Sequence, residues 1–377
     1  MANNSENWIQ KILEPAGIKV NGKNPWDIRI ANPDFYNRVK AQGSLGLGES
    51  YMDGWWECDK LDDFFYKILS SDITSRIGLS LPVLLDFIRA KFFNLQAIGR
   101  AFQIGERHYD IDNDLFRSML GKTMAYSCGY WKNARNLDKA QESKLDLICK
   151  KLNLKKGDRV LDIGCGWGSF AYHAAKNYGV EVLGITVSKE QIKLAEKICR
   201  GLPVEFKLQD YRELNNPSTQ KKFSHIVSIG MFEHVGPKNY KTFFEIANNC
   251  LKKDGLFLLH TIGSPKTSSG TDPWVNKYIF PNGKLPSLKQ IASNVENLFM
   301  IEDVHNFGAD YDKTLMAWHE NFEKAWPKLK SKYDQRFYRM WNYYLLSYAG
   351  AFRARDLQLW QIVLSPHGVP GGYKSIR

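Results

Sequence analysis

The sequence lacks the features that mark several large classes of protein. No apolar run approaches the roughly 20 residues that a membrane-spanning helix requires, and the first residues, MANNSENWIQ, show no charged-then-apolar signal pattern. The six cysteines form no CxxC pair and no regular framework, so we expect reduced thiols and no metal site. Internal repeats and compositionally biased tracts are also lacking. We therefore expect a globular protein that is made and kept in the cytoplasm.

Acidic residues are outnumbered by basic ones, and the imbalance is confined to part of the chain. Of 377 residues, 52 are Lys or Arg and 40 are Asp or Glu, which gives a formal net charge of +12. Residues 1–105 carry 12 of each sign, whereas residues 321–377 hold 10 basic and 3 acidic side chains. Together with 11 Trp, 18 Tyr and 21 Phe, this charge suits nucleic acid, an anionic membrane face, or plain solubility. Charge alone leaves these three readings open.

The pattern of the chain changes after the amino-terminal region. Residues 1–105 are typical of helices with turns, and the apolar-rich segment 79–102 is expected to pack on a core or lie along a membrane surface. From about residue 139 strands and helices alternate, which predicts an α/β fold, a doubly wound parallel sheet with helices on both faces. We predict a small, mainly helical domain at 1–105 and a catalytic domain at 106–377. Its strands are expected at 159–164, 180–186, 204–210, 225–230, 255–263 and 357–365.

A glycine-rich turn follows the first of these strands. VLDIGCGWGSF (160–170) places Gly164, Gly166 and Gly168 between a strand and a helix, where the backbone can approach a ligand closely. The spacing is not the G-x-G-x-x-G of dinucleotide folds, and no acid ends the second strand, which disfavours an NAD-dependent oxidoreductase. Asp162 directly before the turn is typical of S-adenosylmethionine-dependent methyltransferases. A plain structural turn remains the alternative.

Longer motifs narrow the choice further. Eight of them occur in one order: HYDIDNDLF (108–116), YSCGYW (126–131), VLDIGCGWGSF, GMFEHVGPKNY (230–240), LLHTIG (258–263), DPWVNKYIFPNG (272–283), NFGADYDKTLMAW (306–318) and GAFRARDLQLWQ (350–361). Together they resemble the bacterial cyclopropane-fatty-acyl-phospholipid synthases. The resemblance implies a Rossmann-like class I methyltransferase that transfers a methylene group from S-adenosylmethionine to the cis double bond of an unsaturated acyl chain in a membrane phospholipid. It also implies a carbocation that bound bicarbonate deprotonates.

The resemblance assigns the candidate site residue by residue. The bicarbonate pocket would consist of the side chains of Cys128, Glu233, His260 and Tyr311 and the backbone N–H of Ile262. The cofactor would contact Tyr126, Ser127, Asp162, Gly164, Gly166, Gly168, Thr186, Ser188, Gln191, Gln209 and Asp210. Singly, each has a structural alternative: a buried thiol, a core histidine, a packing aromatic, or a helix cap for Glu233 and Ser188. Independently of the family, Glu233 and His260 follow or end strands, which places them at the carboxyl edge of the sheet.

A lipid substrate would bring the enzyme to a membrane. We expect a homodimer that binds the phospholipid bilayer peripherally at the inner face of the cell membrane, through 1–105 and the basic stretch 321–377, with insertions 264–287 and 311–350 covering the lipid. No nucleic-acid partner is expected, because Asn-Pro-Pro-Tyr type motifs are lacking. Two alternatives stay open: an enzyme that stops at a methyl or methylene branch, and a catalytically silent lipid-binding protein.

Overall fold

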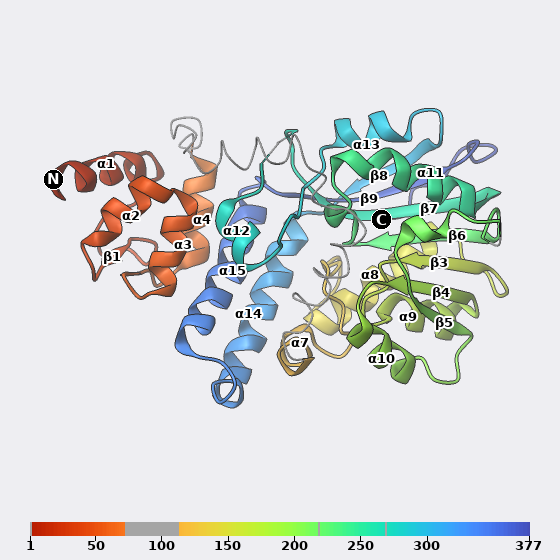
Figure 1. Cartoon of the computed structure of the whole chain (residues 1–377), viewed down its shortest axis with the longest axis horizontal. Coiled ribbons are helices and arrows are strands. Elements are labelled where there is room, and N and C mark those ends of the chain that lie inside the picture. Colours follow the sequence, from red (N-terminus) through yellow and green to blue (C-terminus); the bar gives the residue numbers. More distant parts are fainter. Residues whose placement is uncertain (1, 72–112, 218, 268–269) are drawn as a thin grey trace. The chain divides into compact units, whose positions relative to one another are not determined.

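The computed structural model describes residues 2–71, 113–217, 219–267 and 270–377 (Figure 1). The helix predicted at 79–102 and the domain boundary predicted at residue 105 lie outside the described residues, as does the first part of the HYDIDNDLF motif. The internal contacts of the chain divide it into two compact units. The first unit comprises 1–94, 269–282 and 311–357, and the second comprises 95–268, 283–310 and 358–377.

This division differs from the predicted domains 1–105 and 106–377. Residues 269–282 and 311–357 group with the amino-terminal residues, although strands of the large sheet come before and after them in the sequence. The reason is helix packing: α15 (Gln335–Arg353) packs on α3 (Ser44–Met52) and on α4 (Leu61–Ser70). Contacts between helices so far apart in sequence leave no signal in local periodicity.

The first unit is built from helices and one small sheet. Its helices are α1 (Ala2–Leu13), the 3-10 helix η1 (Glu14–Ala16), α2 (Asp34–Gln42), α3, α4, α12 (Pro273–Tyr278), the part of α14 (Ala309–Leu329) from residue 311 on, and α15. The mainly helical character predicted for the amino-terminal region is thus confirmed for residues 2–71. The strands β1 (Arg29–Ile30) and β2 (Trp56–Glu57) form an antiparallel pair that the sequence analysis did not predict.

Close contacts between distant segments hold the first unit together. A Cβ built at Gly350 of α15 would lie 2.5 Å from the carbonyl oxygen of Asp62, so only glycine permits this approach of α15 to α4. Arg353 pairs with the Asp62 carboxylate at 2.8 Å. The ring of Trp274, from α12, lies 4.5 Å from that of Tyr343 on α15. These contacts explain why three separate stretches of sequence form one unit.

The second unit is a seven-stranded sheet between two layers of helices. Its elements are α7 (Asn113–Leu120), α8 (Leu137–Lys151), β3 (Arg159–Ile163), α9 (Ser169–Tyr178), β4 (Glu181–Thr186), α10 (Lys189–Ile198), β5 (Val204–Leu208), η3 (Tyr211–Leu214), β6 (Phe223–Ile229), η4 (Phe232–His234), η5 (Pro237–Asn239), α11 (Tyr240–Cys250), β7 (Leu251–Gly263), α13 (Leu288–Val295), β8 (Met300–Asn306) and β9 (Gln358–Ser365). All six predicted strands are present, whereas β8 and α13 were not predicted.

The strand order of this sheet is β5-β4-β3-β6-β7-β9-β8. Neighbours from β5 to β7 are parallel, and β9 is antiparallel to both β7 and β8. The chain order reverses beside β3, which is the point where ligands bind in open α/β sheets. The structure therefore confirms the predicted Rossmann-like class I methyltransferase fold.

Two apolar clusters cover the two faces of the sheet. Val160 of β3 belongs to the cluster formed with α8 and α9, and Leu161 to the cluster formed with α11 and α13. Since Val160 and Leu161 are successive residues of one strand, these two pairs of helices cover opposite faces of the sheet. Because side chains alternate along a strand, Asp162 shares the face of Val160, and His260 shares that of Leu258, which also packs with α8. Two polar side chains at strand ends thus face the layer of α8.

Candidate active site

The carboxyl ends of five parallel strands meet at one edge of the sheet, and most predicted site residues lie there. Asp162 and the glycine turn come from β3, Thr186 from β4, Gln209 and Asp210 from the end of β5, Glu233 from the loop after β6, and His260 and Ile262 from β7. The N–H of Gly230 donates to the carbonyl oxygen of His260 at 2.9 Å, which ties the ends of β6 and β7 together.

The turn after β3 contains two kinds of glycine. Gly164, Gly166 and Gly168 all have positive φ, at 85°, 54° and 81°. A Cβ built at Gly164 would lie 2.6 Å from Met231, and one at Gly168 would lie 2.9 Å from Phe206, so the packing of the protein itself requires glycine at both positions. A Cβ built at Gly166 would meet no protein atom within 4 Å. A ligand can therefore approach the backbone at Gly166, toward which α9 directs its free N–H groups.

Asp162 is a buried carboxylate near a buried ammonium group. Its side chain is 1% exposed, and neither carboxylate oxygen has a hydrogen-bond partner. Burial raises the pKa of Asp162 to about 7, while the positive charge of Lys144 acts to lower it. Lys144, from α8, is equally buried, and burial lowers the pKa of its ammonium group to about 8. Asp162, directly before the glycine turn, thus interacts electrostatically with Lys144 of α8.

Helix α8 also holds the YSCGYW segment against the site. Lys144 Nζ donates to Ser127 Oγ at 2.9 Å, and Gln141 Nε2 donates to the Ser127 carbonyl oxygen at 2.8 Å. A Cβ built at Gly230 would lie 3.9 Å from Ser127 Cβ, so this segment reaches the end of β6. Cys128, which follows Ser127, is fully buried, and its thiol donates to the carbonyl oxygen of Gly129 at 3.1 Å.

Tyr126 belongs to an aromatic group beside the glycine turn. The ring of Phe116, from α7, lies 5.3 Å from that of Tyr126 and 5.1 Å from that of Trp167. Trp167 is the residue between the last two glycines of the turn and is buried. The structure therefore places Tyr126 next to the turn, and its contact with a cofactor stays a prediction.

Glu233 is a buried carboxyl group with one oxygen engaged. Its Oε1 accepts from the Ile262 N–H at 2.6 Å, whereas Oε2 has no hydrogen-bond partner and is buried. Burial raises the pKa of Glu233 to about 7, against the opposing effect of the hydrogen bonds that it accepts. Near neutral pH the group thus exchanges its proton readily. The Ile262 N–H, predicted as a direct pocket contact, donates to Glu233 in this structure, and its contact with bicarbonate stays a prediction.

His260 is a buried, neutral imidazole. Gln361 Nε2, from β9, donates to His260 Nδ1 at 3.3 Å. Burial and the nearby positive charges of Lys144 and Lys151 hold the pKa of His260 well below its ordinary value. With Gln361 Nε2 as the donor to Nδ1, the single ring proton is assigned to Nε2, which is buried and has no hydrogen-bond partner. The ring edge of Phe307 contacts His260 at 5.8 Å between centroids and restricts the imidazole.

The predicted ribose-binding residues form a small network of their own. Thr186 Oγ1 donates to Gln191 Oε1 at 2.7 Å, and Ser188 Oγ accepts from the Gln191 N–H at 3.4 Å. Ser188 is therefore the N-cap of α10, which was its structural alternative. All three side chains are buried at the end of β4. The structure brings them together, and their contact with a ribose stays a prediction.

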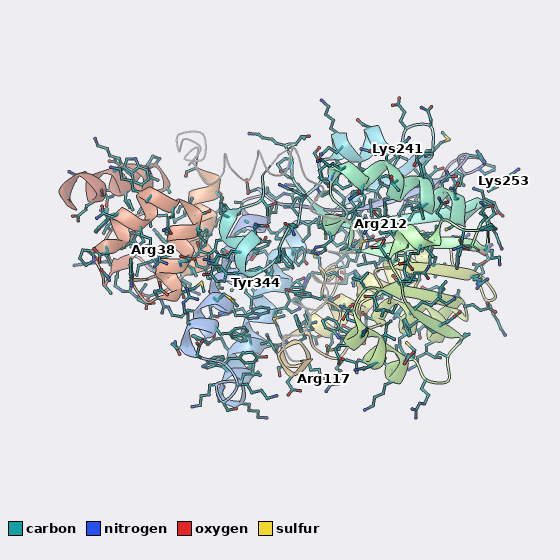
Figure 2. The ribbon with its side chains drawn as sticks, viewed as in Figure 1. Arg38, Arg117, Arg212, Lys241, Lys253 and Tyr344 are labelled. Atoms are coloured by element: carbon teal, nitrogen blue, oxygen red, sulfur yellow. The ribbon has the colours of Figure 1, made fainter. Side chains whose placement is uncertain are left out.

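At the end of β5, Asp210 is already engaged within the protein. Its carboxylate accepts from Arg212 Nε and Nη2, both at 2.7 Å, and from the Arg212 N–H at 2.9 Å. Arg212 is labelled in Figure 2. Gln209, beside it, donates its backbone N–H to the Thr186 carbonyl oxygen at 2.9 Å. Both residues lie at the cofactor edge, where adenine contacts stay a prediction.

Tyr311 belongs to the first unit, unlike the other predicted pocket residues. Its ring stacks on that of Phe352 at 4.5 Å and meets Trp318 edge-on at 5.9 Å. The packing alternative considered for Tyr311 is thus present in the structure. Its place in a bicarbonate pocket stays a prediction.

Sequence reasoning missed four residues that support the site. Lys144 and Gln141 hold Ser127, Gln361 orients His260, and Phe307 packs against the same ring. A helix pattern with Lys and Gln on an otherwise apolar face was the available signal for the first two. Gln361 and Phe307 gave none, because their role depends on the pairing of β9 with β7.

Two further findings concern the part of the chain that the structure describes. None of its helices is long and apolar enough to span a bilayer. Within the same residues, no group of three or more His, Cys, Asp or Glu is arranged to bind a metal ion.

Comparison with known proteins identifies the family of the chain. The family model described as mycolic acid cyclopropane synthetase matches residues 97–362. The chain belongs to this family. It is 56% identical over 375 residues to the cyclopropane-fatty-acyl-phospholipid synthase of Escherichia coli strain K12, covering 99% of this chain and 97% of that protein. The chain is therefore an enzyme of the S-adenosylmethionine-dependent methyltransferase class, as the sequence motifs predicted.

Two solved structures are similar to a large part of the chain. The cyclopropane synthase MmaA2 of Mycobacterium tuberculosis is 30% identical, with a TM-score of 0.64, covering 70% of this chain and 97% of that one. The mycolic acid cyclopropane synthase CmaA1, complexed with SAH and CTAB, is 30% identical, with a TM-score of 0.63 and the same coverage.

Proposed function

We propose that this enzyme is a cyclopropane-fatty-acyl-phospholipid synthase that uses bound bicarbonate as its base. The single observation that carries the proposal is the pair of buried, unpartnered polar atoms Glu233 Oε2 and His260 Nε2 beside the glycine turn. Because buried polar atoms are nearly always hydrogen-bonded, these two groups at adjacent strand ends are suited to bind a small polar guest. The 56% identity to the Escherichia coli synthase supports the same activity.

The residues around the glycine turn fit S-adenosylmethionine. Gly166 admits a close ligand, and the unpartnered Asp162 carboxylate suits the cationic part of the methyl donor. Thr186, Ser188 and Gln191 would meet the ribose, Gln209 and Asp210 the adenine, and Tyr126 and Ser127 would cover the cofactor. A related synthase solved with SAH supports this assignment. When bound, the cofactor supplies a methyl group that is attached to a positively charged sulfur. When the methyl group is transferred, the sulfur keeps the electron pair of the carbon–sulfur bond.

The pocket residues fit bicarbonate, which would supply the base. His260 donates its Nε2 proton to an anion oxygen, and Glu233, with a pKa of about 7, shares a proton with a second oxygen. Cys128 and the Ile262 N–H would complete the pocket. Neutral His260 adds no second acid, so the bound anion keeps its basicity.

The chemistry explains why these groups are buried. The alkene of the acyl chain forms a carbon–carbon bond to the methyl group, which leaves a carbocation on the chain. Loss of one proton from the added methyl group then supplies the electron pair that closes the ring. Because water would trap the cation, the site must exclude it, and aromatic rings stabilise the charge. Phe307, whose ring packs against His260, would be one of these aromatic rings.

The substrate also implies a place of action. An acyl double bond lies inside a membrane leaflet, so the enzyme must bind the bilayer surface. We infer peripheral binding at the inner face of the cell membrane, as a homodimer, through the amino-terminal region and the exposed lysines near the end of α14. Hydrophobic contact would supply insertion, and each lysine near an anionic surface would add ~1 kcal/mol.

One experiment tests the activity. Lipids from bacteria that express the chain are analysed by mass spectrometry for a gain of one CH2 group with loss of the double bond. A methyl- or methylene-branched product would instead identify the alternative enzyme class, and unchanged lipids would identify a silent lipid-binding protein.

A second experiment tests the base. Glu233→Gln and His260→Ala are expected to lose most turnover and still bind S-adenosylmethionine, because they alter the anion pocket alone. Turnover of the unmodified enzyme should fall in carbonate-free buffer and return when bicarbonate is added. Full turnover without carbonate would overturn this part of the proposal.

A further inference from the structure

Helix α8 carries two buried polar side chains toward the site. Gln141 is 0% exposed and Lys144 is 1% exposed. Positions three apart share one face of a helix, and Ala140, beside them, contacts the same segment. A lysine is almost never fully buried without a partner, because its charge loses hydration. The Lys144 ammonium group should therefore have partners within the protein.

The first role of this face is to hold a loop. Gln141 Nε2 donates to the carbonyl oxygens of Ser127 at 2.8 Å and Ala125 at 3.4 Å. The Tyr130 N–H donates to the Ala140 carbonyl oxygen at 2.9 Å. Lys144 adds its bond to Ser127 Oγ. The segment that carries Ser127 and Cys128 is thus fastened to α8 at several points, and Lys144 makes the only one of these contacts that bears a full charge.

The second role is electrostatic. The charged or titratable groups that interact with Lys144 come from four elements: Cys128 from the loop, Asp162 from β3, His173 from α9 and His260 from β7. Asp162 is the only carboxylate among them. Since both Asp162 oxygens lack hydrogen-bond partners, the nearby ammonium group is the main source of favourable interaction for its charge.

We propose that Lys144 is a positioning residue of the cofactor site, whose ammonium group fixes Ser127 and balances the Asp162 carboxylate. The inference rests on the proposed function, because it takes the glycine turn as the cofactor site. It adds a residue of α8 to that site. The buried charge of Lys144 holds the loop at Ser127 in position and interacts with Asp162 at the end of β3.

Helix α8 provides a matched control. Lys151 lies seven residues further along, is 0% exposed, and also has a pKa that burial lowers to about 8. Its partners are Asp303 at 3.5 Å and His305 at 3.1 Å, away from the glycine turn. Substitution of either lysine therefore removes one buried charge from the same helix, and only one of the two faces Asp162.

The test is calorimetric titration with S-adenosylmethionine. Lys144→Met is expected to weaken binding at least about tenfold, the loss of one charge-assisted buried hydrogen bond. Lys151→Met should lower the thermal unfolding midpoint and leave the affinity within about threefold. In assays, Lys144→Met should raise KM for the cofactor more than it lowers kcat. Affinity unchanged by Lys144→Met, or weakened equally by Lys151→Met, would overturn the proposal.

A double substitution isolates the charge. In an Asp162→Asn background there is no carboxylate to balance, so adding Lys144→Met should remove only the bond to Ser127 and cost less affinity than it does in the unmodified protein. If Lys144→Met alone does not fold, the double variant is expected to fold, and circular dichroism showing it unfolded would also overturn the proposal. Unmodified protein that failed to bind S-adenosylmethionine would instead contradict the proposed function.

Discussion

At the scale of single residues, Gly166 separates ligand binding from packing. Gly166→Val should abolish detectable S-adenosylmethionine binding in calorimetry, because a branched side chain would occupy the approach to the backbone while contacting no protein atom. The positive φ of 54° adds strain of roughly 1–2 kcal/mol, which a stable fold tolerates.

Gly201 offers the control for that substitution. It also has a positive φ, 83°, and a Cβ built there meets no atom within 4 Å, but it follows α10 outside the site. Gly201→Val should lower thermal stability by a similar amount and leave cofactor affinity unchanged. Equal affinity in a folded Gly166→Val protein would exclude this turn as the cofactor site.

Glu233 should give the enzyme a pH-dependent stability. Burial raises its pKa from 4.5 to about 7, so the native state retains a proton that the unfolded chain releases. The free energy of unfolding therefore decreases as pH rises from about 4.5 to about 7 and is level above that range. The full penalty is on the order of 3 kcal/mol.

Glu233→Gln removes this titration and keeps an acceptor for the Ile262 N–H. The variant should gain stability relative to the unmodified protein as pH rises from about 4.5 to about 7 and keep that gain above this range, measured by urea unfolding. Asp162, whose pKa is raised in the same direction, is common to both proteins and does not affect the difference. A difference that stays constant with pH would contradict the burial of a titrating carboxyl group here.

At the scale of elements, the contact between α8 and the YSCGYW segment is tight enough to test by volume. A Cβ built at Gly129 would lie 2.9 Å from Ala140 Cβ. Gly129→Ala should therefore destabilise the protein by ~1–3 kcal/mol and weaken cofactor binding, because the segment must move away from α8.

The compensating change is Ala140→Gly, which removes the opposing methyl group. Alone it should cost ~1 kcal/mol, since glycine disfavours a helix interior. Combined with Gly129→Ala, it should restore part of the lost cofactor affinity, and thermal unfolding should show less destabilisation than the sum of the single changes. Strict additivity would mean that Gly129 and Ala140 do not act through their contact.

At the scale of the whole molecule, membrane binding should depend on lipid charge. Lys328 and Lys330 are exposed near the end of α14. We expect stronger flotation with vesicles that contain phosphatidylglycerol than with neutral ones, and weaker binding as salt rises. Lys328→Glu with Lys330→Glu should reduce binding to anionic vesicles strongly, because two positive charges become negative and the net charge falls by four units.

The matched control is Lys252→Glu with Lys253→Glu, an equal change of charge at exposed positions of β7 in the second unit. It should reduce vesicle binding less. Removing residues 1–100 would be a poorer test of lipid access, since it would also uncover the side of α15 that packs on α3 and α4. Binding that ignores both lipid charge and salt would contradict the electrostatic part of the proposal.

The sequence predicted the parts of the molecule in which local pattern and function coincide. The strand that ends at Asp162, the three glycines and the helix after them form one continuous segment, so their order alone indicates the turn. Glu233 and His260 were placed at the sheet edge because each lies at the end of an expected parallel strand. The edge strand β8 was missed: its exposed Met300, Ile301 and Val304 obscure the alternation that marks a half-buried strand.

The sequence by itself determined the family and the class I methyltransferase sheet and predicted the residues of the candidate site, because these depend on short motifs and on the periodicity of strands and helices. The tertiary structure alone decided which segments form each unit, since α15 meets α4 only after folding. It also decided the partners of Asp162 and His260. Lys144 lies on a different element from Asp162, and Gln361 lies far from His260 in sequence. Burial on one face of the sheet brings each pair together. Charge and hydrogen bonding at the site therefore arise from packing, which no motif records.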